Sequence, residues 1–200
     1  MTIPQYCGQE HFSKMKIITK KEYINRMTYY SKDKIDRPHN EALKYVQEGD
    51  IVLSAGCGSG REVLFLNNKR CKITAIDYDK EMIDCSKNII DNKNIEYILG
   101  DFSKFERKEY YNKVVCLFNT IPFLNKQQLE DFTKNSYINL RKGGSLIITF
   151  MDRWGSFNSA MHYLLGHNKN YTKRHLFKLL SRFKINHFRI GRYLVIIATK

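Results

Sequence analysis

The stretch Ile51–Val63 constrains the fold of this chain more than any other segment. It begins with three apolar residues, passes through Gly56, Gly58 and Gly60, and continues with apolar residues at helical spacing. This order predicts a buried strand, a tight turn and a helix start, because glycine tolerates positive φ and lets other groups approach the backbone closely. The free N–H groups of such a helix start suit a ligand with a polar or anionic end.

A second apolar segment, Lys72–Asp77, ends in a carboxylate 17 residues after Gly60. An acidic residue about 20 residues beyond a glycine loop is placed to accept hydrogen bonds from both hydroxyls of a ribose. A glycine loop alone is a weak indicator of a binding site, and a plain strand-to-helix turn is the alternative. The carboxylate at this spacing favours the binding site.

Strands and helices are predicted to alternate from residue 39 to residue 151. The further expected strands are Ile95–Leu99, Lys113–Asn119 and Ser145–Met151, the last after a turn at Arg141–Gly144. The expected helices are Glu22–Tyr30, His39–Gln47, one with Asp79 as its N-cap, and Gln127–Leu140, and residues 1–20 are expected to form an arm without regular structure. Each strand is a near-continuous apolar run, which indicates a parallel sheet covered by helices on both faces.

The C-terminal segment predicts a change of strand direction. After a helix at Thr172–Ser181, the expected strands Lys184–Ile190 and Tyr193–Thr199 are separated only by Gly191 and Arg192. No crossover helix fits in two residues, so these strands must form a hairpin. The predicted fold is therefore α/β and doubly wound in three layers, with a seven-stranded, mostly parallel sheet and one antiparallel strand from the C-terminal hairpin.

Composition limits the class of protein. A length of 200 residues makes one domain the default expectation. No apolar run approaches the roughly 20 residues of a membrane span, and the N-terminus has no charged-then-apolar leader pattern. The five cysteines include no C-x-x-C pair, so we expect free thiols in a reducing cytoplasm and no metal site.

Charge is distributed unevenly. The formal net charge is +14, and all 20 acidic residues lie at or before Asp152. Residues 1–152 carry 24 basic and 20 acidic residues, for a net +4, whereas residues 153–200 carry ten basic and no acidic ones. The C-terminal quarter therefore predicts an anionic partner, with a composition rich in Lys, Asn and Ile throughout as the alternative explanation.

Four elements together resemble the class I S-adenosylmethionine-dependent methyltransferases, over about residues 40–151 and in the terminal hairpin. The resemblance implies the cofactor S-adenosyl-L-methionine, the product S-adenosyl-L-homocysteine and a domain over residues 37–200, preceded by an arm and cap helix at 1–36. The implied cofactor-binding residues are Ser54, Gly56, Cys57, Gly58, Gly60, Asp77, Tyr78, Met82, Asp101, Phe102 and Asn119. By this resemblance the glycines pass the methionine part, Asp77 binds the ribose hydroxyls, Tyr78 and Met82 flank the adenine, Asp101 and Phe102 bind it, and Asn119 lies beside the donor methyl.

The chain departs from the family at Ser54, where the family usually has a carboxylate that supports the cofactor's ammonium group. A residue of the N-terminal helix could close the methionine end instead, and the candidates are Arg26, Tyr29 and Tyr30. A nicotinamide dinucleotide enzyme is the structural rival. It is disfavoured because the loop reads G-x-G-x-G, because about 50 residues precede it, and because Asp101 and Phe102 would have no role in it.

Methyl transfer needs alignment more than a catalytic side chain, so the missing obvious base is compatible with an enzyme. Asn119–Pro122 lacks the N-P-P-aromatic motif of base-amine methyltransferases, and no Pro-Cys or Thr-Cys pair marks a cytosine-C5 enzyme. The segment looks more like that of small-molecule O- and N-methyltransferases, although Pro122 and Phe123 stand where many of those have a histidine. The candidate bases are His162, His167 and His175, each with a surface or packing role as the alternative.

Residues 152–171 leave the carboxyl end of the last parallel strand, so we expect a substrate-cap insert there. Its candidate acceptor contacts are Trp154, Phe157, Met161 and Tyr163. We favour methyl transfer to a small acceptor that bears phosphate, carboxylate or a nucleotide. The alternatives are an RNA methyltransferase that uses the basic C-terminal surface and a cofactor-binding protein without activity.

Overall fold

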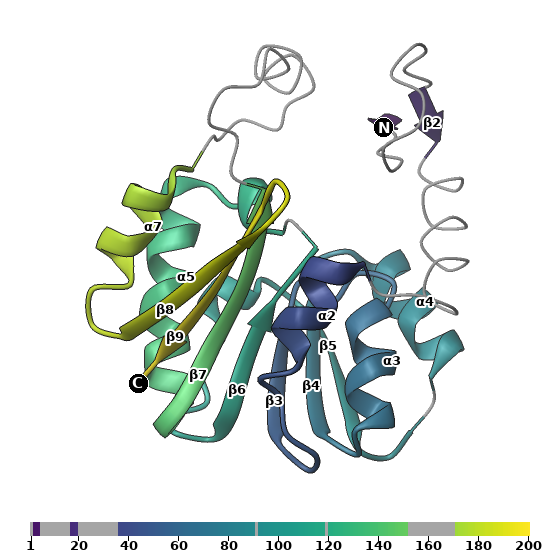
Figure 1. The fold of residues 1–200 in the computed structure, drawn as a ribbon. Helices are drawn as coiled ribbons and strands as arrows, with labels where there is room; N and C mark the ends of the chain where they lie inside the picture. Colours follow the sequence, from purple (N-terminus) through teal and green to yellow (C-terminus); the bar gives the residue numbers. More distant parts are fainter. Residues whose placement is uncertain (1, 5–16, 20–35, 91, 119, 152–170) are drawn as a thin grey trace.

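A seven-stranded sheet lies at the centre of the computed structural model of this chain (Figure 1). The structure describes residues 2–4, 17–19, 36–90, 92–118, 120–151 and 171–200. The strand order is β5-β4-β3-β6-β7-β9-β8. The strands are β3 (Ile51–Ala55), β4 (Lys72–Asp77), β5 (Ile95–Leu99), β6 (Tyr111–Cys116), β7 (Leu140–Met151), β8 (Lys184–Ile190) and β9 (Tyr193–Thr199).

The strand directions confirm the predicted mixed sheet. β3 pairs in parallel with β4 and β6, β4 with β5, and β6 with β7. β9 lies between β7 and β8 and is antiparallel to both. Its two-residue link to β8 leaves no room for the crossover that a parallel pair requires. The chain changes sides between β3 and β6, and ligands of open α/β sheets bind at such a switch point, beyond the carboxyl ends of the strands. We call this side of the sheet, where β3 to β7 end, the carboxyl edge.

Helices cover both faces of the sheet, which gives the predicted three layers (Figure 1). Buried residues of α2, α3 and α4 form one core cluster with one face, and those of α5 and α7 form a second cluster with the other face. The helices are α2 (Arg37–Leu43), α3 (Arg61–Asn68), α4 (Lys80–Ile89), α5 (Lys126–Asn139) and α7 (Lys173–Leu179), with 3-10 turns η1 (Phe102–Lys104) and η2 (Ile121–Phe123). The Asp79 side chain accepts a hydrogen bond from the Glu81 N–H, which confirms Asp79 as the N-cap of α4.

The structure corrects the expected turn at Arg141–Gly144, because β7 already begins at Leu140. The Gly143 N–H donates to the Lys200 carbonyl, and the Lys200 N–H donates to the Gly144 carbonyl. The end of the chain therefore supplies backbone partners that hold these residues in the strand. β6 pairs Tyr111 with Leu140 and Lys113 with Ser145, so residues 141–144 of β7 lie at a shift in the register between the two strands.

The structure also corrects other expectations, and β6 spans Tyr111–Cys116 instead of Lys113–Asn119. α2 ends at Leu43 instead of Gln47, although Val46 is still buried. The N-terminal arm was expected to lack regular structure, but Thr2–Pro4 (β1) and Ile17–Thr19 (β2) pair as antiparallel strands. Three-residue strands are too short to display a period of two, so pattern analysis does not detect them.

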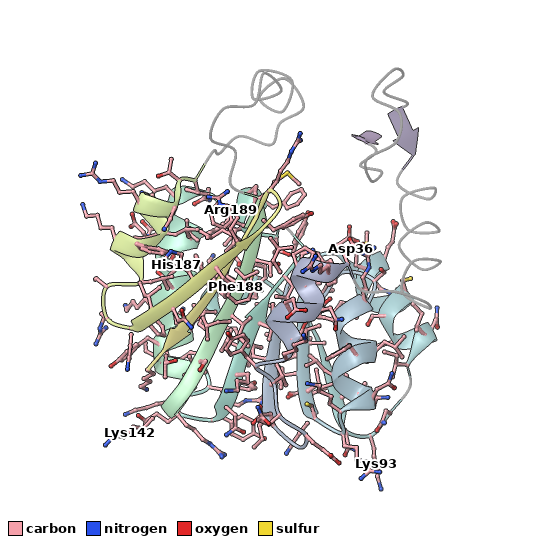
Figure 2. All side chains as sticks on the ribbon, viewed as in Figure 1. Asp36, Lys93, Lys142, His187, Phe188 and Arg189 are labelled. Carbon is pink, nitrogen blue, oxygen red and sulfur yellow. The ribbon has the colours of Figure 1, made fainter. Side chains whose placement is uncertain are left out.

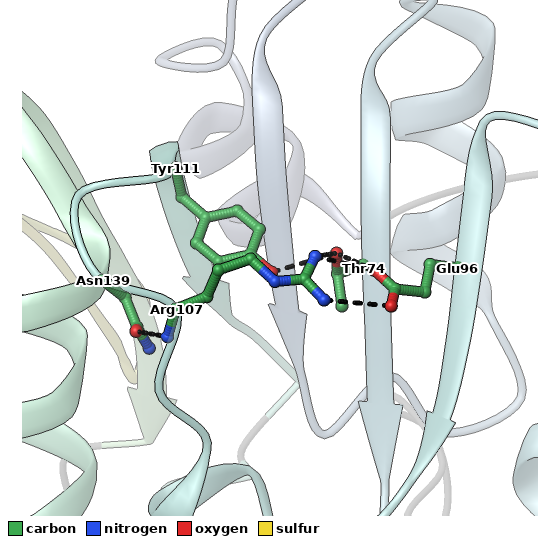
Figure 3. Close-up of polar contacts among 5 residues, drawn as sticks. All are labelled: Thr74, Glu96, Arg107, Tyr111 and Asn139. Atoms are coloured by element: carbon green, nitrogen blue, oxygen red, sulfur yellow. Dashed lines mark hydrogen bonds and ion pairs between the residues drawn. The ribbon is translucent and has the colours of Figure 1, made fainter.

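A polar network ties the segment before β6 to the sheet (Figure 3). Both guanidinium NH2 groups of Arg107 donate to the Glu96 carboxylate of β5, at 2.8 and 3.0 Å. The Tyr111 hydroxyl donates to Thr74 Oγ1 at 3.0 Å, and the Arg107 N–H donates to Asn139 at the end of α5. The network links β4, β5, β6 and α5, so the chain that leaves η1 has a fixed course.

Candidate functional site

The loop between β3 and α3 is held against the end of β4. The N–H groups of Gly56 and Cys57 both donate to the Ile76 carbonyl, at 2.8 and 3.0 Å. Gly60 caps α3 with φ +90°, and a Cβ there would lie 2.2 Å from Ser86 Oγ. The loop therefore needs glycine at position 60 both for its conformation and for the close approach of α4.

Gly56 is the point at which three parts of the carboxyl edge meet. It has φ +75°, and a Cβ there would lie 2.5 Å from Thr120 Cγ2 and 3.2 Å from the Phe102 ring. Thr120 follows β6 and Phe102 follows β5. The glycine loop, the segment after β5 and the segment after β6 are thus in contact, which sequence spacing did not reveal. At Gly58, by contrast, the position of a Cβ is open.

Asp77 lies at the glycine loop, as its position after β4 predicted. Its Oδ2 accepts from the Gly58 N–H at 2.8 Å and its Oδ1 accepts from the Asp79 N–H at 3.0 Å. The residue is only 7% exposed, and burial raises the pKa of its carboxyl above the usual value. Two backbone donors hold the carboxylate beside the open side of the loop.

Asp101 caps the 3-10 turn that begins at Phe102. Its Oδ1 accepts from the N–H and the hydroxyl of Ser103, and its Oδ2 accepts from Gln128 at 3.2 Å. Burial opposes ionisation, but these hydrogen bonds lower the pKa of Asp101 below its usual value. Phe102 is buried and packs edge-on against Phe132, with 5.3 Å between ring centroids.

Two apolar side chains are exposed at the ends of neighbouring strands. Tyr78 follows β4 and is 71% exposed, and Leu99 ends β5 and is 55% exposed. Asp77 is the register partner of Leu99, so Leu99 lies level with Asp77 at the carboxyl edge, and Tyr78 is one residue further along the chain. Met82, which the family resemblance placed beside the adenine together with Tyr78, is buried on α4.

Ser54 has an acidic partner that the sequence analysis missed. The Ser54 hydroxyl donates to Glu62 Oε1 at 2.7 Å, and both residues are buried. Burial raises the pKa of Glu62 to about 7. The available signal was an acidic residue two positions after Gly60, in the first turn of α3.

His39 of α2 is a second residue that the sequence analysis did not assign to the site. Its Nδ1 lies 2.8 Å from Thr149 Oγ1 of β7, and its ring centroid lies 4.0 Å from that of Phe118. Phe118 has φ +52°, and the Arg61 guanidinium lies 4.6 Å from its ring centroid. Burial, aided by Arg61, lowers the pKa of His39 to about 3, so its imidazole is neutral at pH 7. His39 therefore packs the carboxyl edge behind Phe118.

The other predicted site residues divide into two groups. His175 lies on α7, where its ring stacks on Tyr171 with 5.4 Å between ring centroids, and its buried Nε2 has no hydrogen-bond partner among the described residues. Cys57 is buried in the glycine loop, and burial raises the pKa of its thiol. The following predicted residues lie outside the described residues: Arg26, Tyr29, Tyr30, Asn119, Trp154, Phe157, Met161, His162, Tyr163 and His167.

The described residues hold neither a membrane-spanning helix nor a cluster of metal ligands. None of the described helices is long and apolar enough to cross a membrane. Nor do the described His, Cys, Asp and Glu side chains form a group of three or more that could hold a metal ion.

Comparison with known proteins identifies the kind of domain. Residues 52–144 match the family described as a methyltransferase domain. A solved structure described as a TehB-like SAM-dependent methyltransferase, from Corynebacterium glutamicum, is 20% identical with a TM-score of 0.70, and the match covers 90% of this chain and 97% of that one. At this identity the likeness shows the fold.

Two curated relatives match shorter segments. The carboxy-S-adenosyl-L-methionine synthase of Shewanella sediminis is 28% identical over 116 residues, which are 54% of this chain and 47% of the relative. The protein named probable ribosomal RNA small subunit methyltransferase A, from Pyrococcus furiosus, is 35% identical over 92 residues, which are 44% of this chain and 33% of the relative. The matches thus span less than half the length of either relative.

Proposed function

We propose that this chain, whose residues 52–144 match the family described as a methyltransferase domain, transfers a methyl group from S-adenosylmethionine to an oxygen or nitrogen atom of a small anionic acceptor. The observation that carries the proposal is the convergence at Gly56, where the segments after β3, β5 and β6 meet beside Asp77. This is the switch point of the sheet, where ligands of such folds bind.

The side chains at this point fit the proposed cofactor. Asp77 is a buried acceptor for the ribose hydroxyls, next to the open face of Gly58. The Ser54 and Glu62 pair places a polar and acidic group behind the glycine loop, where the methionine part is expected. Asp101, whose Oδ2 also accepts from Gln128, and the exposed Tyr78 are the proposed adenine contacts. The proposed arrangement therefore offers one carboxylate acceptor to each polar part of the cofactor: Glu62 to the methionine part, Asp77 to the ribose and Asp101 to the adenine.

The proposed mechanism relies on positioning. When bound, the cofactor supplies a methyl group on a positively charged sulfur, so transfer is an in-line displacement that depends on alignment and exclusion of water. His39 is held neutral by burial and its Nδ1 is used by Thr149, so its role is to support Phe118. A general base is required only for an acceptor that is protonated at pH 7. His162, His167 and His175 remain the proposed candidates.

An anionic acceptor is supported by the basic residues at the carboxyl edge. Arg189 and Arg192 are exposed at the β8–β9 turn, and the register pairs Tyr193 with Met151, the last residue of β7. Figure 2 shows Arg189 at the end of β8 that is far from Lys142. Arg61 is placed at the start of α3, over Phe118. These side chains make the potential positive where the acceptor would enter.

The rest of the proposal concerns how the chain is divided. We propose that residues 1–36 act as an arm and cap, that 37–200 form the methyltransferase domain, and that 152–171 form an acceptor insert. Within that insert, Trp154, Phe157, Met161 and Tyr163 are the proposed acceptor contacts. A cytoplasmic location is proposed from the cysteine content.

Calorimetry with S-adenosylhomocysteine tests the cofactor. Asp77→Ala should weaken binding by roughly 100-fold, because it removes a charged acceptor of two hydrogen bonds. Asp84→Ala, which removes a half-exposed carboxylate of α4 that pairs with Lys80, is the matched control and should bind as the unchanged protein does. Binding of NAD without binding of S-adenosylhomocysteine would refute the assignment.

Transfer of a labelled methyl group tests the acceptor class. We expect phosphate- and carboxylate-bearing compounds to be methylated and their neutral counterparts to react poorly. Arg192→Ala should raise the KM for an anionic acceptor, whereas Lys142→Ala, at the opposite edge of the sheet (Figure 2), should leave it unchanged. Equal effects of the two variants would remove the support for an anionic acceptor site at this edge.

RNA is the second candidate acceptor. It is favoured by the exposed basic residues of α7, the following turn and β8, namely Arg174, Lys178, Arg182 and Lys184, and by the printed name of the Pyrococcus relative. RNA binding that weakens steeply with salt, together with methyl transfer to RNA, would favour this acceptor. Salt-insensitive methylation of a small acid would favour the first.

A further inference from the structure

Glu62 is a buried carboxylate at the N-terminus of α3, two residues after the glycine loop. It is 4% exposed, and Ser54, which donates to its Oε1 at 2.7 Å, is fully buried. Among the described residues Glu62 forms no ion pair with a lysine or arginine side chain. A buried carboxylate without a cationic partner is costly, so the arrangement calls for a compensating positive group.

Four ionisable groups interact electrostatically with this carboxylate, three of them from other parts of the fold. Arg61, on the same helix, favours the ionised form, whereas Asp77, at the end of β4, disfavours it. Cys57 of the loop and Cys116 of β6 are neutral thiols, because burial raises the pKa of each. The Arg61 guanidinium lies over the Phe118 ring, 4.6 Å from its centroid. Among these four groups Arg61 is the only cation, and it forms no ion pair with the Glu62 carboxylate.

We propose that Glu62, held in place by the Ser54 hydroxyl, is the counter-ion of the α-ammonium group of the bound cofactor. The inference rests on the proposed function, because it takes the glycine loop as the methionine end of the site. Ser54 stands where a carboxylate is usual in this family, and its hydroxyl brings no charge of its own. The hydrogen bond joins it to a carboxylate that comes from α3 instead of β3.

A proton linkage follows from this pairing. Burial raises the pKa of Glu62 to about 7, so the free protein carries a partly protonated carboxyl at neutral pH. An ammonium group favours the ionised form, so binding should release a proton. With a free-protein pKa of about 7, affinity for an amino-acid-bearing ligand should be about tenfold higher at pH 8 than at pH 6.

Calorimetry with two ligands tests the assignment. S-adenosylhomocysteine carries the ammonium group, and 5′-methylthioadenosine has the same nucleoside and thioether without the amino acid. Glu62→Gln keeps the hydrogen bond from Ser54 but removes the charge. It should weaken S-adenosylhomocysteine binding roughly 10- to 100-fold, the usual effect of one charged hydrogen bond, and change methylthioadenosine binding less than about twofold.

Two further measurements complete the test. For S-adenosylhomocysteine, the unchanged protein should bind about tenfold more tightly at pH 8 than at pH 6 and should release a proton, which titrations in buffers of different ionisation enthalpy measure. For methylthioadenosine it should show neither effect. Adding Ser54→Asp to Glu62→Gln should restore affinity, because it returns a carboxylate to the strand end. The inference is overturned if Glu62→Gln binds both ligands normally, or weakens both equally. If the unchanged protein binds methylthioadenosine, but the affinity for S-adenosylhomocysteine and its pH dependence do not change in Glu62→Gln, only this inference fails. If the unchanged protein binds neither ligand, the proposed function is refuted as well.

Discussion

Replacing Glu62 with glutamine should stabilise the ligand-free protein at alkaline pH. The carboxyl is fully buried and its pKa is raised from 4.5 to about 7, with burial as the largest cause. In the unfolded chain the same group ionises near its ordinary value. The folded state therefore holds a proton that the unfolded state has released over the interval from pH 4.5 to pH 7.

The sign and size of the effect follow from this difference. Below pH 4.5 both states are protonated and ionisation costs no stability. As pH rises from 4.5 to 7, ionisation of Glu62 stabilises the unfolded state progressively relative to the folded state. Above pH 7 the full loss of folding free energy is present. A shift from 4.5 to about 7 corresponds to about 3 kcal/mol, because one pKa unit is worth about 1.4 kcal/mol. Glutamine is neutral throughout and avoids this cost.

Urea unfolding of both proteins at pH 4.5, 6, 7 and 8 measures the difference. The free energy of unfolding of Glu62→Gln should match that of the unchanged protein at pH 4.5 and exceed it by about 3 kcal/mol at pH 8. The difference isolates Glu62 because the other groups titrate in both proteins. Glu48→Gln, which breaks an exposed pair with Arg70, controls for the lost charge and should change stability by less than about 1 kcal/mol at every pH.

A constant difference across the pH range would refute the reasoning, because it would mean that Glu62 titrates alike in the folded and unfolded states. A less stable variant at pH 8 would also refute it. In that case the ionised carboxylate would be stabilising the fold.

Three other changes have outcomes that unfolding experiments can measure. Gly60→Ala should destabilise the fold by about 2 kcal/mol or more, because a Cβ at this positive φ would overlap the Ser86 hydroxyl. Gly58→Ala has open space for a Cβ and should cost only the conformational strain of positive φ, about 1 kcal/mol. Equal losses of stability would contradict the packing argument. Between pH 6.5 and pH 5 the unchanged protein should lose about 2 kcal/mol of stability, because the pKa of His39 is about 3 in the folded state and protonation therefore favours the unfolded state. His39→Gln should remove this loss. Parallel pH profiles of the two proteins would argue against a buried neutral imidazole. Arg107→Ala should lower the free energy of unfolding by no more than about 1 kcal/mol, because the ion pair with Glu96 is partly exposed. A loss of several kcal/mol would contradict this, and would mean that the network of Figure 3 supports the whole segment before β6.

Local sequence was enough to predict the elements and the direction of the strands. The apolar run within Lys72–Asp77 forms β4, which is buried from its second residue on, as a central strand covered on both faces requires. The run Ile95–Leu99 forms β5 at the edge of the sheet, where the strand is only partly buried. The two-residue gap at Gly191 and Arg192 forced a hairpin on steric grounds, and β9 is antiparallel to both neighbours. Asp77 lies at the glycine loop because the carboxyl ends of adjacent parallel strands meet at one edge.

Contacts between distant residues were decided only by the tertiary structure. Nothing in the order of residues indicates that Thr120 and Phe102 both press against Gly56. The backbone of Lys200 draws Gly143 and Gly144 into β7, although their local pattern is that of a turn. Ser54 alone suggested a weakened cofactor site, and packing of α3 against β3 brings the Glu62 carboxylate to its hydroxyl. Periodicity and spacing report on a residue's own element, whereas burial, charge compensation and pKa depend on which elements the fold brings together.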